Sequence, residues 1–127
     1  MTAHPLNLSQ SDREWIAAML DAYGRAMART RKKEMPHLVL TFVMVDVPEA
    51  EQRADEILDA LRLPPHYKRV SSSGAVYVTC RMRSEAVLAE VGHLLTNERI
   101  LASLGRALDE VDVERATRAA NAGRWGA

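Results

Sequence analysis

The segment HLVLTFVMVDV, residues 37–47, contains the longest apolar run of the chain and decides the fold prediction. Apolar side chains occupy both of its alternating faces, with Val39, Val43 and Val45 on one and Leu38, Leu40, Phe42 and Met44 on the other. A strand with one face in water alternates between apolar and polar residues, whereas a strand covered on both sides is apolar throughout. We therefore predict a central strand that needs cover on both faces.

Helices are predicted on either side of this strand. Before it, Ser11 and Glu14 form a capping box, and an apolar stripe continues to Met27, which favours a long helix over residues 12–33. After it, apolar residues at helical spacing favour a second helix over residues 49–62, which Pro64 and Pro65 end. Only a short connection separates the predicted strand from this second helix, which indicates that the helix packs back on the sheet.

The stretch HYKRVSSSGAVYVTCRMR, residues 66–83, predicts a β-hairpin. With glycine at the left-handed position of a three-residue turn, Val70 faces Val76, and the apolar face continues through Val78, Cys80 and Met82. The opposite face then collects Tyr67, Arg69, Tyr77, Thr79 and Arg81. A one-residue change in the turn would exchange these faces on the first strand.

After the hairpin, Ser84 is expected to cap a helix, and residues from Asn97 onward keep helical spacing in two further segments. The predicted order is helix, strand, helix, strand, strand, helix, helix, an α+β arrangement whose middle resembles a ferredoxin-like split βαβ unit. About three strands are identified, and LDEVDVE, residues 108–114, is the candidate for a short fourth strand. The candidates for covering the second face of the sheet are the N-terminal helix, the C-terminal helices and another copy of the protein. We expect the protein's own helices to cover it.

Composition places the chain among single globular domains, residues 1–127, because 127 residues with 47% hydrophobic content can bury a core. The formal net charge is zero, so attraction of the whole protein to nucleic acid or an anionic membrane is not indicated. Cys80 is the only cysteine, which excludes an intramolecular disulfide. With no secretory leader and no apolar run long enough to span a bilayer, we expect a cytoplasmic protein without a membrane partner.

The zero net charge hides three charged blocks. Residues 25–33 carry five basic side chains and no acid, residues 46–59 carry six acids, and residues 62–83 carry five basic side chains and no acid. Basic side chains bind phosphates, and tyrosine rings stack on bases. Candidate residues for binding a partner or a nucleic acid are Arg25, Arg29, Lys32, Lys33, Tyr67, Arg69, Tyr77 and Arg81.

Signals for chemistry are few. Glu90 and His93 have the spacing of carboxylate-bridged metal sites, yet such sites need a second copy of this motif. Cys80 falls on the apolar face of its strand, where a buried structural thiol is expected. We therefore predict no catalytic residue, metal or cofactor, and a non-enzymatic regulatory or assembly subunit that binds a protein partner or self-associates. The alternative is nucleic-acid binding through the basic helix end and the tyrosine-bearing hairpin.

Overall fold

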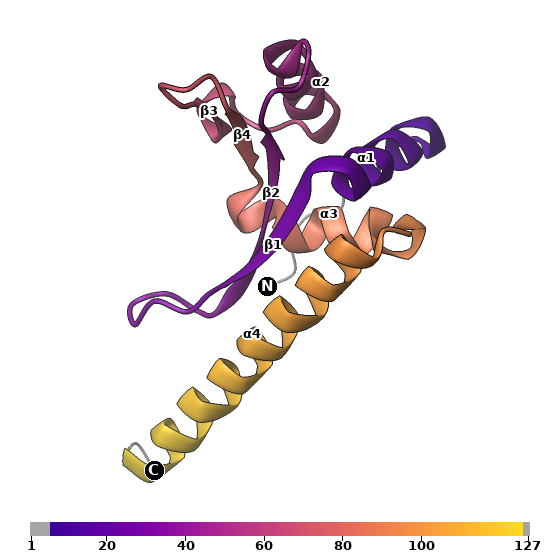
Figure 1. The fold of residues 1–127 in the computed structure, drawn as a ribbon. Coiled ribbons are helices and arrows are strands. Elements are labelled where there is room, and N and C mark those ends of the chain that lie inside the picture. The colour runs from indigo at the N-terminus through magenta and orange to yellow at the C-terminus, as the bar shows by residue number, and fades with distance from the viewer. Residues whose placement is uncertain (1–5, 126–127) are drawn as a thin grey trace.

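The computed structural model describes residues 6–125 and has an α+β architecture (Figure 1). The elements are α1 (Gln10–Tyr23), β1 (Gly24–Arg29), β2 (His37–Met44), α2 (Ala50–Leu61), β3 (Lys68–Val70), β4 (Val76–Thr79), α3 (Ser84–Val91) and α4 (Glu98–Trp125). The strands form one antiparallel sheet in the order β1-β2-β4-β3. The α+β prediction is confirmed, but the sheet has four strands instead of about three.

The fourth strand comes from residues that we predicted to be helical. Helix α1 begins after Ser9, whose Oγ accepts a hydrogen bond from the Asp12 N–H at 3.1 Å, and not at the predicted Ser11 cap. It ends at Tyr23, and the next six residues pair with β2 from Gly24 opposite Phe42 to Arg29 opposite His37. A ladder of this length outweighs weak local helix propensity. The predicted helix over residues 12–33 is therefore confirmed as far as Tyr23 and wrong beyond it. The strand sought in residues 108–114 is also wrong, since these residues lie within α4.

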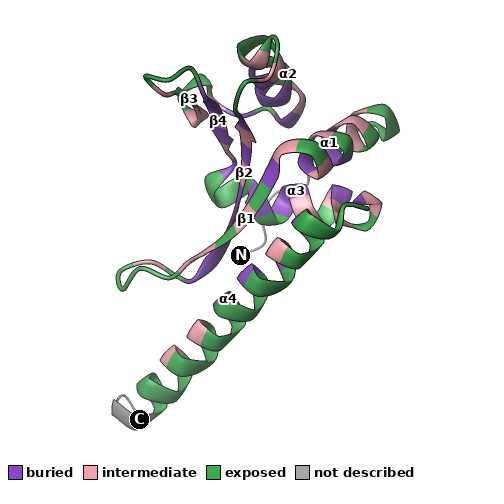
Figure 2. Cartoon of the chain, in the orientation of Figure 1, coloured by how far each residue is buried: buried purple, intermediate pink, exposed green. Residues whose placement is uncertain are grey.

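Strand β2 is central, as predicted, because it pairs with β1 on one edge and with β4 on the other. On one face its side chains are fully buried in the core beneath α1, α2 and α3, where they are Leu38, Leu40, Phe42 and Met44. Burial of a large apolar side chain stabilises the fold by about 1.5–3 kcal/mol. Figure 2 shows this buried layer along the sheet. The core thus lies on one side of the sheet only.

The predicted hairpin has the expected turn. Val70 lies opposite Val76, and the Ser71 N–H donates to the Ala75 carbonyl at 2.8 Å across the three intervening residues. Gly74 has a φ of +89°, a conformation that favours glycine. Because β4 ends at Thr79, the next residues leave the strand, and Met82 is 67% exposed. Placing Met82 in the core was wrong, whereas Cys80 is buried as predicted.

Ser84 does not act as the predicted helix cap. It is fully buried, and its Oγ accepts a hydrogen bond from the Leu40 N–H at 2.8 Å while donating to the Arg81 carbonyl at 2.7 Å. This hydroxyl therefore ties the start of α3 to the central strand.

Helix α4 lies along the outer edge of β1 (Figure 1). It is one continuous helix where we predicted two segments, and Asn97 Oδ1 accepts from the Arg99 N–H at 2.8 Å at its start. Ser103 Oγ accepts from the Ala26 N–H at 3.1 Å and donates to the Ala26 carbonyl at 3.0 Å. Arg99 also donates to the Gly24 carbonyl. Side chains of α4 therefore form hydrogen bonds with the backbone groups of β1 that point away from β2.

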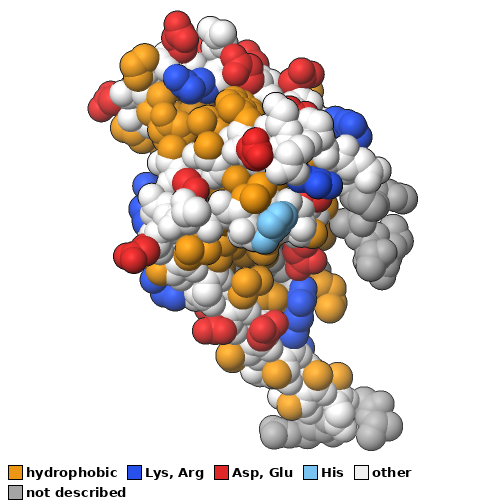
Figure 3. Space-filling model, turned by 90° about the vertical axis from the view of Figure 1, so that its right-hand side faces the viewer, with side chains coloured by type: hydrophobic (Ala, Val, Ile, Leu, Met, Phe, Trp, Pro, Cys, Tyr) orange, Lys and Arg blue, Asp and Glu red, His pale blue; other side chains and the backbone are white. Residues whose placement is uncertain are grey.

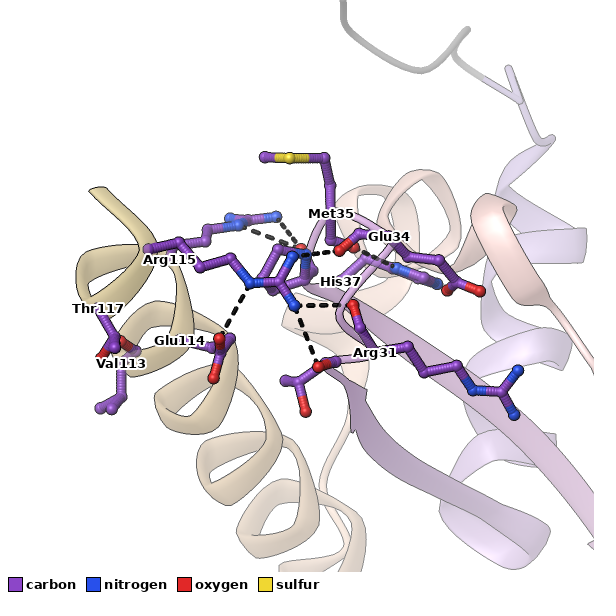
Figure 4. Close-up of polar contacts among 11 residues, drawn as sticks. Arg31, Glu34, Met35, His37, Val113, Glu114, Arg115 and Thr117 are labelled. Carbon is purple, nitrogen blue, oxygen red and sulfur yellow. Dashed lines mark hydrogen bonds and ion pairs between the residues drawn. The ribbon is translucent and has the colours of Figure 1, made fainter. Parts of the chain in front are cut away.

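The second half of α4 holds the loop between β1 and β2 (Figure 4). Arg118 donates to the carbonyls of Thr30 at 3.1 Å and Arg31 at 2.7 Å, and also to that of Glu34. Arg115 donates to the Pro36 carbonyl at 3.0 Å.

Within residues 6–125, no helix combines the length and apolarity needed to cross a bilayer.

Gly24 allows α1 to turn directly into β1. A Cβ at this position would lie 2.6 Å from the Leu20 carbonyl oxygen, so Gly24→Ala should lower the free energy of unfolding by about 1–3 kcal/mol. A matched control is Gly105→Ala on the exposed side of α4, where a Cβ meets no atom within 4 Å and should stabilise by about 0.5–1 kcal/mol. Urea denaturation measures both values, and equal shifts in the two variants would contradict this account of Gly24.

Candidate functional site

The sheet face opposite the core is not covered by α1, α2 or α3 (Figure 1). We call it the open face. Antiparallel pairing alternates side chains between faces, so the register decides its members. They are Arg25, Met27 and Arg29 from β1, His37, Val39, Thr41 and Val43 from β2, Arg69 from β3, and Tyr77 and Thr79 from β4. The cover that we expected from the protein's own helices is not found over this face among the described residues.

The central cavity lies on the open face, and one further cavity adjoins it at each end. The central one has a volume of about 600 Å³ and shares Arg29 and Thr79 with a cavity of about 750 Å³ at the His37 end of β2. It shares Arg25 and Val43 with a cavity of about 290 Å³ at the other end. Every second residue from His37 to Val47 lines at least one of the three. The cavities therefore form one groove along β2, which we call the arginine groove.

The groove combines an apolar floor with basic walls. Val39 is only 6% exposed, Val43 is half-buried, and Met27 beside them is 60% exposed. The arginines along the three cavities are Arg25, Arg29, Arg31, Arg69, Arg81 and Arg99. Among the described lining residues the only carboxylate is that of Glu34, whose Oε2 lies 3.4 Å from Arg29 Nε. The groove thus carries a strong positive charge around aliphatic side chains.

The structure brings together most of the predicted site residues. Arg25, Arg29, Arg69 and Tyr77 line the central cavity, and Arg81 lines the neighbouring one. The remaining three lie elsewhere: Lys32 and Lys33 are exposed in the loop after β1, and Tyr67 packs against the core.

Two groove arginines were missing from our candidates. Arg31 belongs to the basic run that we had noted, so its charge was a usable signal. Arg99 reaches the groove from α4, and no local pattern in the sequence indicates this position.

Each candidate tyrosine already has an arginine over its ring. Arg69 Cζ lies 4.6 Å from the centre of the Tyr77 ring, and Arg81 Cζ lies 4.6 Å from that of Tyr67. Exposed cation–π pairs of this kind contribute about 0.5–1 kcal/mol. These contacts fix the guanidinium groups beside the groove and cover one face of each ring.

Cys80 and Glu90 both have structural surroundings. Burial raises the pKa of the Cys80 thiol to about 12, so at neutral pH the thiol stays protonated and is a poor nucleophile. Glu90 Oε1 accepts hydrogen bonds from the Leu8 N–H at 2.9 Å and from Arg13 Nη2 at 3.1 Å. Nowhere in residues 6–125 do three His, Cys, Asp or Glu side chains lie close enough together to hold a metal ion.

No protein-family model matches this chain, and no curated protein matches its sequence. The side chains of the groove are therefore the basis on which a function is assigned.

Glu90 joins α3 to the segment before α1, and this contact predicts a pH dependence of stability. Desolvation raises the pKa of the carboxyl, but the Leu8 N–H and the Arg13 guanidinium outweigh it and hold the pKa below its ordinary value. A lowered pKa means that the stabilisation is present above the pKa of the unfolded state and is lost as pH falls through that of the folded state. Glu90→Gln should lower the free energy of unfolding by about 2 kcal/mol at pH 7. The difference between the variant and the native protein should disappear in acid.

The matched control is Glu85→Gln, which removes a carboxylate from an exposed pair with Arg115 at 3.3 Å. Exposed pairs of this kind contribute about 0–1 kcal/mol. Urea denaturation from neutral to acidic pH distinguishes the two residues. A constant difference between the native protein and Glu90→Gln across the whole range would contradict the assignment.

Proposed function

We propose that this protein is a non-enzymatic regulatory or assembly subunit whose arginine groove binds an acidic segment of a protein partner. The observation that carries this proposal is the composition of the groove, with six arginines and one carboxylate around an aliphatic floor in the described chain. Apolar burial supplies affinity, and complementary charge supplies orientation and rate of association. An acidic segment with apolar side chains satisfies both parts of the surface.

The floor favours protein over nucleic acid. Sequence-tolerant binding of single strands uses aromatic rings on which bases stack. Tyr77 is the only aromatic ring among the described residues of the central cavity, and Arg69 covers one of its faces. Met27, Val39 and Val43 provide aliphatic contacts that suit apolar side chains better than bases.

Charge also argues against pairing of two open faces. In a two-fold dimer the same surface meets itself, so Arg25 and Arg69 of the two copies would approach arginines. The exposed acids of the chain lie elsewhere, with Glu51, Asp55, Glu56 and Asp59 on α2. Figure 3 shows acidic side chains at the upper end of the molecule, where Figure 1 places α2. A separate acidic partner avoids the like-charge contact.

Nucleic-acid binding is the second candidate, and the loop after β1 favours it. Arg31, Lys32 and Lys33 are exposed there, and Arg31 lines the central cavity. Together with the groove they form a longer basic surface. Phosphate binding to such a surface has a steep salt dependence.

Two finer proposals concern topology and compartment. The order of β2, β4 and β3 agrees with a ferredoxin-like split βαβ unit, and we propose a permuted version in which β1 takes the place of the usual last strand.

We also propose a cytoplasmic location, supported by a sequence whose single cysteine is a buried free thiol.

Crosslinking in the source cells tests the proposed function. A photoreactive amino acid replaces Met27, which lies on the open face, and in a second variant it replaces Leu108, which is 40% exposed on α4. We expect a protein crosslink from position 27 alone, with the attached peptide rich in aspartate and glutamate. The double substitution Arg25→Gln/Arg69→Gln should reduce its yield at least about fivefold because it removes two charges from the groove.

The crosslinked product also decides between the two candidates. Nucleic acid attached at position 27 would replace the proposed function with the second candidate. Equal yields from positions 27 and 108, or a yield unaffected by loss of Arg25 and Arg69, would contradict a specific groove.

A further inference from the structure

The arginine groove offers side chains and little free backbone to an occupant. Strand β2 pairs with β1 over His37–Phe42 and with β4 over Thr41–Met44, and the Leu40 N–H and carbonyl bond to Ser84 and Cys80, so most of its backbone groups are used within the sheet. A peptide lying in extended form over Val39 and Val43 would leave its own N–H and C=O groups against aliphatic side chains, where unpaired polar groups are costly. A helix pairs these groups internally and presents only side chains to the surface. The floor therefore favours a helical occupant.

The edges of the sheet also favour a helical occupant over an extended one. An extended peptide normally joins a sheet by pairing with an edge strand. Ser103 already bonds both backbone groups of Ala26, and Arg99 bonds the Gly24 carbonyl, so the β1 edge is occupied by α4. The other edge, β3, has three residues, which gives an added strand few pairing positions. The surface that remains for a long partner segment is the open face.

The dimensions of the groove suit one helix. Strand β2 has eight residues and spans about 26 Å at about 3.3 Å per residue. At 1.5 Å per residue, a helix of about 17 residues covers this length. Strands β1 and β3 flank the groove three strand spacings apart, about 14 Å, while a helix with its side chains is about 10–12 Å wide.

The charges lie on both sides of that path. Arg25 and Arg29 project from β1 on one side, and Arg69 projects from β3 on the other, with the aliphatic floor between them. A helix with an apolar stripe between two acidic flanks is complementary to this pattern. We propose that the arginine groove binds an amphipathic α-helix of a partner protein, lying along β2 with acidic residues on both sides of an apolar stripe. This inference rests on the proposed function and specifies the form of the acidic segment.

Peptide binding tests this inference with the whole chain. The probe is a synthetic peptide of about 18 residues, with leucines along one helical face and glutamates on both flanks. Two matched peptides keep its length: one has lysine at each glutamate position, and the other has two central prolines and the same charge. We expect the acidic peptide to bind and gain helical circular dichroism, with at least tenfold weaker binding by both matched peptides. These changes remove the complementary charge or the helix, respectively.

Protein variants locate the binding site. Arg25→Gln/Arg69→Gln should weaken the acidic peptide at least about tenfold, because both exposed arginines flank the groove. Lys32→Gln/Lys33→Gln removes the same charge from the exposed loop and should change affinity less than about threefold, since neither lysine lines any of the three cavities of the groove. Circular dichroism of each free variant checks that the fold is intact.

The outcomes separate this inference from the proposed function. Equal binding of the proline peptide would overturn the helical form and leave an acidic partner in place. Equal losses in the arginine and lysine variants would show general charge attraction and overturn the groove as the site. Failure of the acidic peptide to bind would overturn the inference, while an acidic protein crosslink at position 27 would still support the proposed function. Binding of a single-stranded oligonucleotide in place of the peptide would overturn both.

Discussion

Strand β2 pairs on both edges and carries apolar side chains on both faces, and the rest of the structure is arranged around this constraint. One face, with Phe42 at its centre, is sealed by α1, α2 and α3. The other carries Val39 and Val43 at the floor of the arginine groove. Because both faces belong to one rigid ladder, the core that stabilises β2 also fixes the position of the groove floor.

Helix α4 controls the edge of the same sheet. A free edge strand can pair with other chains, and proteins cover or shorten such edges. Here Ser103 supplies the donor and acceptor that a further strand would have supplied to Ala26. Farther along, Arg118 and Arg115 hold the loop between β1 and β2 through its carbonyl groups. The long helix therefore keeps β1 and its arginines in place, which gives one wall of the groove a fixed position.

The distribution of charge is a property of the fold more than of the composition. The net charge is zero, yet the acids of α2 and the arginines of the open face lie on different surfaces. Arg25 and Arg69 are distant in the chain, and antiparallel pairing through β2 and β4 places them on the same face. Their mutual repulsion in the free protein is screened by water and salt, and an acidic partner converts it into attraction.

The amino-acid sequence by itself determined the central strand, helix α2 and the hairpin turn, because each has a strong local pattern. Val39 to Met44 is apolar on both faces, residues 50–61 follow helical spacing, and Gly74 suits the left-handed position of the turn. Single cross-strand pairs, such as Val70 with Val76, also follow from the turn length.

Only the tertiary structure decided the state of residues 24–29 and the membership of the groove. GRAMAR has a helical stripe as readily as a strand alternation, and pairing with β2 selects the strand. That selection moved Met27 from a predicted helix face to the open face and supplied Arg25 and Arg29 to the groove wall. Arg99 lines the groove from α4, and this position also depends on tertiary packing. Pairing between distant segments depends on the energy of the whole sheet, which no local window of sequence contains.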